Sequence, residues 1–353
     1  MQPTSLDSPS GPAATAPRAT TMRSIVQDRY GPEPEDVLRT AEIARPAIRP
    51  DEVLVKVHAA GVDRGTWHIM AGLPYPIRLA GFGLRRPKNP SPGRAFAGTV
   101  EAVGASVTGV ATGDEVYGTC NSSFAEYACV RADRQSAKPA TLSFDQAAAV
   151  PISGVTALQA VRDHGRVRPG QQVLVVGASG GVGTFAVQIA KAYGAEVAAV
   201  CSTAKADLVH ALRADRVIDY TREDFADGRH RYDVVLDIGG NRRLSDLRRT
   251  LTPKGRLVIV GGENGGRWLG GVDRQLRAQL LSPWTAQTLG TFVASENADD
   301  LASLSGLIEG GKVSPVIDRV YPLSETAAAI RHLLDGRTRG KLVITLRSAG
   351  DRI

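Results

Sequence analysis

The spacing of apolar and polar positions divides the chain into two parts that meet near residue 145. Between residues 22 and 145, short segments alternate apolar and polar residues and are separated by Pro, Gly and Asp, which is typical of β-strands joined by turns. The predicted strands read "SIVQDRYG", "LRTAEIA", "EVLVKVHAAGV", "FAGTVEAVG", "DEVYGT" and "FAEYACV". Residues 73–93 interrupt them with five prolines and no period, as expected of a lid or binding loop. This part predicts a small β-rich domain.

After residue 145 the pattern becomes that of an α/β protein. Residues 145–161 predict helical segments interrupted at Pro151, and short apolar runs then alternate with segments of helical period. The predicted strands are "VLVVG", "EVAAVC", "RVIDY", "DVVLDI" and "RLVIVGG", with helices such as "TFAVQIAKAY" and "KADLVHALR" between them. Parallel strands joined by helical crossovers form a doubly wound sheet, so this part predicts a Rossmann-type domain.

The residues beyond about 290 predict a strand "TFVAS", helices "DDLASLSGLIEGG" and "SETAAAIRHLLDG", and a closing strand "KLVITL". These elements can extend the doubly wound sheet or return to the first domain. The pattern alone does not decide between the two arrangements.

A glycine-rich turn in the second part predicts a nucleotide site. The segment "VLVVGASGGVG" spaces Ala178, Gly180 and Gly183 as in the dinucleotide fingerprint, with alanine at the first glycine position. It follows a predicted strand and opens a predicted helix, where backbone N–H groups can bind a diphosphate. The candidate diphosphate-binding residues are Ser179, Gly180, Gly181 and Val182.

The end of the next predicted strand indicates which nucleotide binds. An NAD site usually has Asp or Glu about 20 residues beyond the glycines, and that carboxylate would repel a 2′-phosphate. Here Cys201 stands at that position, followed by Ser202, Thr203 and Lys205. The sequence therefore predicts NADPH, with Tyr220 as a further candidate beside the phosphate or adenine. Alternatively, Lys205 is a solvated residue at a helix start and Tyr220 an ordinary residue at a strand end.

Composition and charge exclude several classes of protein. The 353 residues are 42% hydrophobic and 22% charged, which suits a globular protein rather than a disordered or fibrous one. The net charge is +7, but basic residues are scattered, so no nucleic-acid partner is expected. No apolar run is long enough to cross a membrane. The three cysteines indicate neither disulfides nor structural zinc. Residues 1–21 predict a disordered tail, and the expected location is the cytoplasm.

The order of these segments resembles the medium-chain dehydrogenase/reductase superfamily, in its zinc-independent quinone oxidoreductase branch. The resemblance rests on "PGRAFAGTVEAVG", "AAVPISGVTALQAV", "VLVVGASGGVGTFAVQIAKAYGAEV", "ADRVIDYT" and "RGKLVITL". It implies a GroES-like catalytic domain over residues 22–145 and a Rossmann domain over residues 146–290. It also implies that residues 291–353 return to complete the catalytic domain, with the active site between the two domains.

Zinc-bearing relatives hold their metal with residues that this chain lacks. Asp63 stands at the first thiolate position, Arg94 and Ala95 replace a His-Glu pair, and Ile152 or Ser153 falls where the last ligand is expected. Zinc needs three or four converging N, S or O ligands, so no metal site is predicted. The chain also departs from the quinone reductases, which often have Asn at the position of Asp63 and an acidic residue at that of Ala95.

The resemblance implies a set of residues around the nicotinamide and the substrate. The candidate catalytic residues are Asp63, Trp67, His68 and Tyr75, and the further cofactor-binding candidates are Thr156, Gly261 and Gly262. Each also has a structural alternative, as a packing aromatic, a loop histidine or a turn residue. The implied function is an NADPH-dependent reductase of quinones or α,β-unsaturated carbonyls, acting on a small-molecule substrate as a homodimer. The alternatives are a zinc-free alcohol or ketone oxidoreductase and a non-catalytic NADPH-binding protein.

Overall fold

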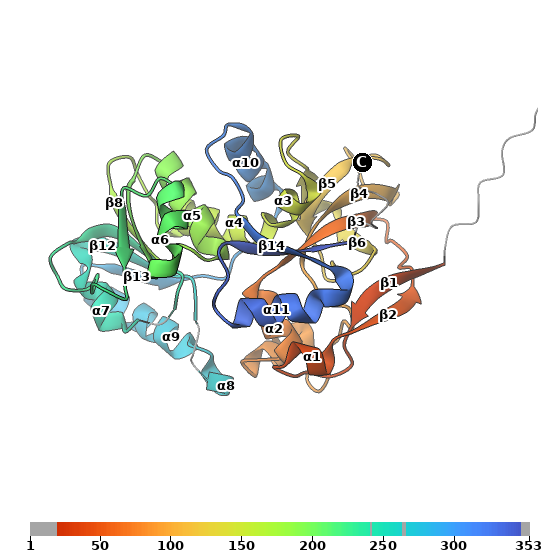
Figure 1. Cartoon of the computed structure of the whole chain (residues 1–353), viewed down its shortest axis with the longest axis horizontal. Coiled ribbons are helices and arrows are strands. Elements are labelled where there is room, and N and C mark those ends of the chain that lie inside the picture. Colours follow the sequence, from red (N-terminus) through yellow and green to blue (C-terminus); the bar gives the residue numbers. More distant parts are fainter. Residues whose placement is uncertain (1–19, 241, 263–265, 347–353) are drawn as a thin grey trace, which may run out of the picture.

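The computed structural model describes residues 20–240, 242–262 and 266–346, which form two large sheets and one two-stranded sheet (Figure 1). Much of the predicted disordered tail, residues 1–19, lies outside the described residues, whereas β1 begins at Thr21. No helix among the described residues is both long and apolar enough to span a membrane.

One large sheet is parallel throughout and has the strand order β10-β9-β8-β11-β12-β13. Its strands are β8 (Gln172–Val176), β9 (Glu196–Cys201), β10 (Arg216–Asp219), β11 (Tyr232–Asp237), β12 (Leu251–Ile259) and β13 (Thr288–Thr291). From β8 the first strands are added toward one edge and the later strands toward the other. This is the doubly wound arrangement, and it confirms the predicted Rossmann-type domain. β13 precedes the predicted "TFVAS" strand, because Thr288–Thr291 pair with β12 and the chain then leaves the sheet.

The helices of this part follow its strands. They are α5 (Gly181–Ala192), η4 (Thr203–Lys205), α6 (Ala206–Ala211), α7 (Leu244–Arg249), α8 (Gly266–Leu269), α9 (Val272–Leu281) and η5 (Ser282–Trp284). β8 and β9 read as apolar runs because helices cover both faces of a parallel sheet. Val173, Leu174 and Val175 of β8 are accordingly inaccessible to solvent.

The other large sheet combines N-terminal and C-terminal strands, in the order β14-β15-β3-β4-β5-β7 with β6 paired to β3. Its strands are β3 (Glu52–Val62), β4 (Ala95–Val103), β5 (Glu115–Thr119), β6 (Tyr127–Arg131), β7 (Gln135–Ala137), β14 (Ile317–Pro322) and β15 (Lys341–Thr345). β15 pairs antiparallel with β3. The last strands therefore join the N-terminal sheet rather than the parallel one, while the domain limits at residues 145 and 290 stay predictions.

The remaining elements surround this second sheet and connect it to the first. They are β1 (Thr21–Val26), α1 (Pro34–Val37), β2 (Arg39–Ala44), α2 (Arg64–Ala71), η1 (Arg78–Phe82), η2 (Ala132–Arg134), α3 (Phe144–Ala148), α4 (Pro151–Gln159), η3 (Ala160–His164), α10 (Ala298–Glu309), η6 (Leu323–Glu325) and α11 (Thr326–Leu334). Figure 1 shows α4 in the middle of the molecule, between the two large sheets.

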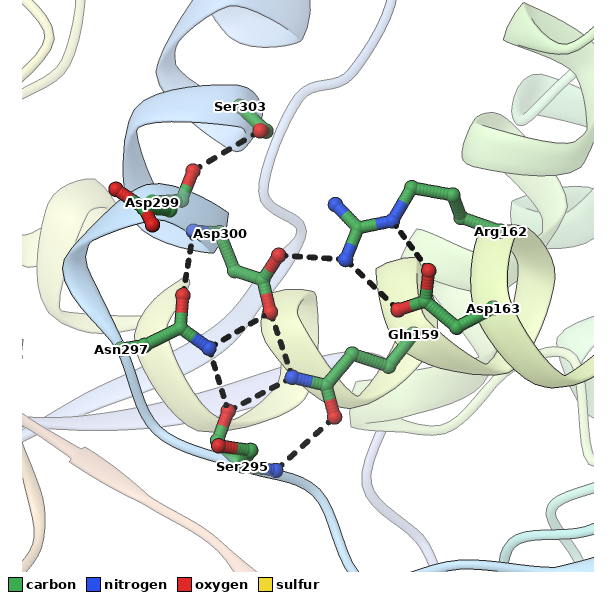
Figure 2. Close-up of polar contacts among 8 residues, drawn as sticks. All are labelled: Gln159, Arg162, Asp163, Ser295, Asn297, Asp299, Asp300 and Ser303. Carbon is green, nitrogen blue, oxygen red and sulfur yellow. Dashed lines mark hydrogen bonds and ion pairs between the residues drawn. The ribbon is translucent and has the colours of Figure 1, made fainter.

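A buried polar cluster ties the end of α4 to the start of α10 (Figure 2). Asp300 accepts hydrogen bonds from Gln159 Nε2 at 2.6 Å, Asn297 Nδ2 at 3.0 Å and Arg162 Nη2 at 2.7 Å. Asn297 also caps α10, since its side chain accepts from the backbone N–H of Asp300. The cluster fixes the C-terminal segment to the helix that leads into the parallel sheet.

Candidate active site

The predicted nucleotide turn has the geometry that its glycines require. Gly177 has a φ of +86°, and Gly180 is the extended N-cap of α5. A Cβ on Gly183 would lie 2.1 Å from the carbonyl oxygen of Gly177, so the helix packs against the strand at a distance that only glycine allows. The first N–H groups of α5 have no partner within the helix and can bind an anion. The turn therefore fits the diphosphate of a dinucleotide.

The C-terminal segment crosses this turn. The N–H of Gly340 donates to the carbonyl oxygen of Ser179 at 2.9 Å, and the Lys341 side chain passes directly over Gly181. Lys341 Nζ then donates to the carbonyl oxygen of Val62, at the end of β3, at 2.9 Å. Burial lowers the pKa of Lys341, and the nearby charge of Asp63 acts in the opposite direction. Lys341, which our sequence prediction missed, thus links the nucleotide turn to the other sheet.

Asp63 caps the helix that starts at this junction. Its carboxylate accepts hydrogen bonds from Thr66 N at 2.9 Å and Thr66 Oγ1 at 3.1 Å, and the residue is 7% exposed. These bonds fix the direction of α2 and leave the carboxylate engaged in a structural contact. The spacing Asp63-x-x-Thr66 before a helix is a signal for such a cap.

The other catalytic candidates are distributed along α2 and the loop after it. Trp67 Nε1 donates to the carbonyl oxygen of Pro32 at 3.1 Å, and its ring packs against the core of the N-terminal sheet. His68 Nδ1 lies 2.8 Å from the carbonyl oxygen of Leu73, so in the neutral ring Nδ1 carries the hydrogen. Tyr75 lies farther along the chain, against α8. The structure therefore does not gather the four candidates into one hydrogen-bonded group.

Tyr75 joins the loop after α2 to α8. Its N–H donates to the carbonyl oxygen of Arg267 at 2.9 Å, and its ring meets that of Trp268 edge-on at 5.0 Å. Residues 266–269 follow shortly after Gly261 and Gly262 at the end of β12. Ligands of doubly wound sheets bind beyond the carboxyl ends of the strands, which is where these segments meet.

A buried ion pair that our sequence prediction missed holds together the carboxyl ends of β11 and β12, beside the nucleotide turn. Asp237, at the end of β11, is inaccessible to solvent and lies 2.5 Å from Arg274 Nη1. Arg274 also donates to the carbonyl oxygens of Arg242 and Gly261, each at 2.9 Å. A Cβ on Gly261 would lie 2.1 Å from the carbonyl oxygen of Ile238, so this glycine allows the close approach of the strand ends.

The residues expected at the adenosine end have partners within the chain. Lys205 Nζ donates to the carbonyl oxygens of Gly336 at 2.8 Å and Thr338 at 2.9 Å, and burial lowers its pKa. Thr203 Oγ1 donates to Asp219 Oδ2 at 2.5 Å. Ser202 lies between β9 and η4 and is partly exposed.

Two further cofactor candidates are Tyr220 and Thr156. The Tyr220 side chain follows β10 and is 53% exposed. Thr156 is on α4, where its hydroxyl donates to the carbonyl oxygen of Ile152 at 2.7 Å. Their roles toward a cofactor stay predictions.

The positions of the zinc ligands are occupied by residues with other contacts. Asp63 caps α2, and Arg94 forms an ion pair with Glu296, which also binds Arg134. Burial raises the pKa of the nearby Cys120 thiol to about 12, which disfavours a thiolate. Within the described ranges, no three His, Cys, Asp or Glu side chains converge as metal ligands would.

Comparisons with known proteins agree with this architecture. Residues 49–140 match the alcohol dehydrogenase GroES-like domain, and residues 212–344 match the zinc-binding dehydrogenase family. The chain is 34% identical to the 2-methylene-furan-3-one reductase of Solanum lycopersicum over 88% of its own length and 76% of that protein. It is 31% identical to the quinone oxidoreductase of Mus musculus, with 92% and 98% covered.

A solved structure shows the same fold throughout. The quinone oxidoreductase from Coxiella burnetii superposes with a TM-score of 0.81 and 30% identity, covering 93% of this chain and all of that one. The GroES-like and Rossmann parts of the predicted fold are thereby confirmed, and so is a nicotinamide-dependent oxidoreductase class. The chain belongs to the quinone oxidoreductase-like branch of the medium-chain dehydrogenase/reductase family.

Proposed function

We propose that this protein is an NADPH-dependent reductase that transfers hydride to a quinone or an α,β-unsaturated carbonyl compound. The observation that carries the proposal is the glycine turn at the start of α5, which Lys341 links to the end of β3, just before α2 begins. The relatives named 2-methylene-furan-3-one reductase and quinone oxidoreductase support this choice of substrate. Both names describe reduction of a conjugated carbonyl system.

The residues of the chain would bind and orient the reactants. The N–H groups at the start of α5 would hold the cofactor diphosphate, and the cofactor supplies the hydride when it is bound. Gly261 and Gly262 let the backbone approach the nicotinamide end. Hydride addition to a conjugated carbonyl leaves a delocalised negative charge, which hydrogen-bond donors such as backbone N–H groups can stabilise. Tyr75 or solvent would supply the proton, while His68 can donate from Nε2 only as an imidazolium.

The reaction is proposed to need no metal. The support is chemical, because Arg94 is a cation paired with Glu296 and the Asp63 carboxylate caps α2. We expect activity to survive prolonged chelation and purified protein to contain far less than one zinc per chain. Stoichiometric zinc in elemental analysis would contradict this part of the proposal.

The preference for NADPH rests on Cys201 at the position of the expected carboxylate and on the nearby Lys205. Arg339 also lies at this end, where it is paired with Asp207 at 2.6 Å. One charge-assisted phosphate contact contributes about 1.5–3 kcal/mol, so NADPH should bind at least about tenfold more tightly than NADH. Equal dissociation constants in isothermal titration would contradict this preference, and Lys205→Ala should reduce it.

The reaction itself can be tested with deuterium-labelled NADPH and an enone. We expect the label at the β-carbon of the product and far slower turnover of the matching saturated ketone. Label on the carbonyl carbon would instead support an alcohol or ketone oxidoreductase, and one solved structure that is 28% identical to this chain is indeed named an NAD-dependent alcohol dehydrogenase. Absence of turnover with tight NADPH binding would support a non-catalytic protein.

The proposed homodimer has a candidate interface on the parallel sheet. β13 is one of the two edge strands, and the adjoining α9 exposes Val272, Leu276 and Leu280 at a spacing of four residues. An edge strand and an apolar helix stripe can pair with a second copy about a two-fold axis. Light scattering should give twice the chain mass, and Leu276→Glu with Leu280→Glu should reduce it to one chain. Cytoplasmic location stays a prediction.

A further inference from the structure

Lys341, beside the nucleotide turn, is a buried cation without a carboxylate in direct contact. Of the lysines and arginines in the described ranges it is the least exposed, at 2%. The buried carboxylate of Asp237 has its counter-charge in Arg274, whereas no ion pair within the described part of the chain includes Lys341. A buried charge without a counter-charge costs free energy. The position of Lys341 therefore suits a cation that meets an anionic ligand.

The ammonium group also has hydrogen-bonding capacity that the protein leaves unused. An ammonium group has three N–H donors, and the carbonyl oxygen of Val62, at 2.9 Å, is the one acceptor among the described residues. The charge of Asp63 favours the protonated form of Lys341. The Asp63 carboxylate itself accepts hydrogen bonds from Thr66 N and Thr66 Oγ1. The ammonium group is thus oriented by Val62 and has donors left for a ligand.

The Lys341 side chain runs along the part of the turn that fits a diphosphate. A Cβ on Gly181 would lie 2.9 Å from Lys341 Cδ and 3.3 Å from Ser153 Oγ, so the lysine stem packs directly against this glycine. Gly181 is the first residue of α5, and its N–H has no acceptor within the helix. Nζ lies beyond Cδ at the end of the same side chain. The ammonium group and the free N–H groups of α5 therefore border the same turn.

The backbone that carries Lys341 is fixed against this turn. The N–H of Gly340 donates to the carbonyl oxygen of Ser179 at 2.9 Å, and the N–H of Lys341 donates to that of Val316 at 2.8 Å. Gly340 has a φ of +96°, and a Cβ there would lie 2.5 Å from the Val316 carbonyl oxygen. Only glycine suits this position. A cation held in advance at its ligand lowers the entropic cost of binding.

We propose that Lys341 binds the diphosphate of the nicotinamide cofactor, with its ammonium group bridging a diphosphate oxygen and the carbonyl oxygen of Val62. This inference rests on the cofactor use of the proposed reductase and adds a residue of the C-terminal segment to the cofactor site. The N–H groups of α5 bind the diphosphate from the turn, and the ammonium group supplies the positive charge that these neutral donors lack. Cofactor binding then also ties the turn to the end of β3.

The inference makes a distinction between the two lysines of the cofactor site. The diphosphate is common to NADPH and NADH, so Lys341 should strengthen the binding of both to the same extent. Lys205 is proposed to favour NADPH alone, through the 2′-phosphate. Loss of Lys341 should therefore weaken both cofactors and leave their affinity ratio unchanged, whereas loss of Lys205 should change the ratio.

The test is isothermal titration of four ligands: NADPH, NADH, ADP-ribose and adenosine 2′-phosphate. Lys341→Met keeps the apolar stem and removes the charge. It should raise Kd about tenfold to a hundredfold for the first three ligands, which contain the diphosphate. It should leave Kd unchanged for adenosine 2′-phosphate, which has no diphosphate. The binding stoichiometry reports the folded fraction of each preparation, so a loss of folded protein is not mistaken for a loss of affinity.

A second variant separates the charge of Lys341 from its contact with β3. Lys341→Gln keeps an N–H donor for the carbonyl oxygen of Val62 but has no charge, and it should weaken the three diphosphate ligands as Lys341→Met does. Lys191→Met is the matched control. Lys191 is on the same helix α5, and its Nζ donates to both carboxylate oxygens of Asp215 at 2.8 Å. This control removes the same net charge and should leave all four Kd values unchanged.

The outcomes separate the inference from the proposed function. Unchanged Kd values for NADH and ADP-ribose in both Lys341 variants would overturn the inference and leave the reductase standing. An equal loss of affinity for adenosine 2′-phosphate, or the same loss in Lys191→Met, would also overturn it, because the effect would then come from structure or net charge. Weaker NADH with unchanged ADP-ribose would place Lys341 at the nicotinamide end instead. Failure of the unmodified protein to bind NADPH or NADH would contradict the proposed function itself.

Discussion

Two buried carboxylates, each facing an arginine, behave differently in this protein. Burial alone would raise the pKa of Asp300, but hydrogen bonds from Gln159, Arg162 and Asn297 outweigh it, so its pKa lies below the ordinary value. Burial also raises the pKa of Asp237, and there the opposing effects of Arg274 and the N–H of Gly240 are too weak to reverse the shift. The direction of the pKa shift therefore depends more on the number of hydrogen-bond donors around the carboxylate than on the presence of one arginine.

The locations of the two carboxylates fit this difference. Asp300 belongs to the cluster of Figure 2, which joins α4 to α10. Asp237 is at the carboxyl end of β11, where Arg274 also binds the carbonyl oxygens of the loops after β11 and β12. Asp300 accepts hydrogen bonds from three side chains and holds α4 to α10. Asp237 has one cationic partner, Arg274, and that arginine binds the loops of the candidate cofactor site.

Removing that cation should produce the largest loss of stability. Arg274→Met leaves Asp237 buried without its counter-charge, and such changes cost about 3–5 kcal/mol. Urea unfolding measures the effect, with Arg277→Met on the same helix as control, since that side chain is 74% exposed. The double variant Asp237→Leu with Arg274→Met should recover part of the loss. A loss no larger than in the control would show that Arg274 is not needed to compensate Asp237.

Asp300→Asn should have a smaller effect because the amide keeps the shape of the side chain. It removes the charge that three donors recognise, which should cost about 1.5–3 kcal/mol in the free energy of unfolding. Asp299→Asn is the control, since Asp299 is the exposed neighbour in Figure 2. Equal stability of the two variants would contradict the structural role assigned to the cluster.

The sequence was sufficient to predict most elements, because each has a clear period. β3 and β9 have the predicted bounds, since an alternating or apolar run ends there at turn residues. The nucleotide turn was also predicted, because its function depends on local glycines. Local patterns of this kind depend little on the rest of the chain.

Contacts between distant segments could not be predicted in the same way. Lys341 reads as the polar start of a strand, and its bond to Val62 spans 279 positions of sequence. Likewise, nothing in "VDRQLRAQLL" indicates that Arg274 is the buried arginine and Arg277 the exposed one until the sheet places Asp237 beneath α9. Asp63 was predicted near the substrate, with a turn residue as the alternative; its carboxylate caps α2, and its role toward a substrate stays a prediction.

The smallest expected effect is a difference in pH dependence between the two carboxylates. The folded-state pKa of Asp300 lies below the ordinary 3.8, so its stabilising contribution is complete above that value and is lost as the pH falls through the folded pKa. The folded-state pKa of Asp237 is raised, so its carboxyl favours folding below the ordinary value, and this contribution is lost as the pH rises through the folded pKa.

Substitution by asparagine should therefore change the pH profile in opposite directions. The stability of the unmodified protein relative to Asp300→Asn should grow with pH up to about pH 5 and then stay level, whereas relative to Asp237→Asn it should decline as the pH rises above about 4. Each unit of pKa difference corresponds to about 1.4 kcal/mol, which urea unfolding at several pH values can resolve. Because both comparisons use the same parent protein, the titration of all other carboxylates cancels. If the stability difference changed with pH in the same direction for both variants, Arg274 would stabilise the charged form of Asp237 as fully as three donors stabilise that of Asp300.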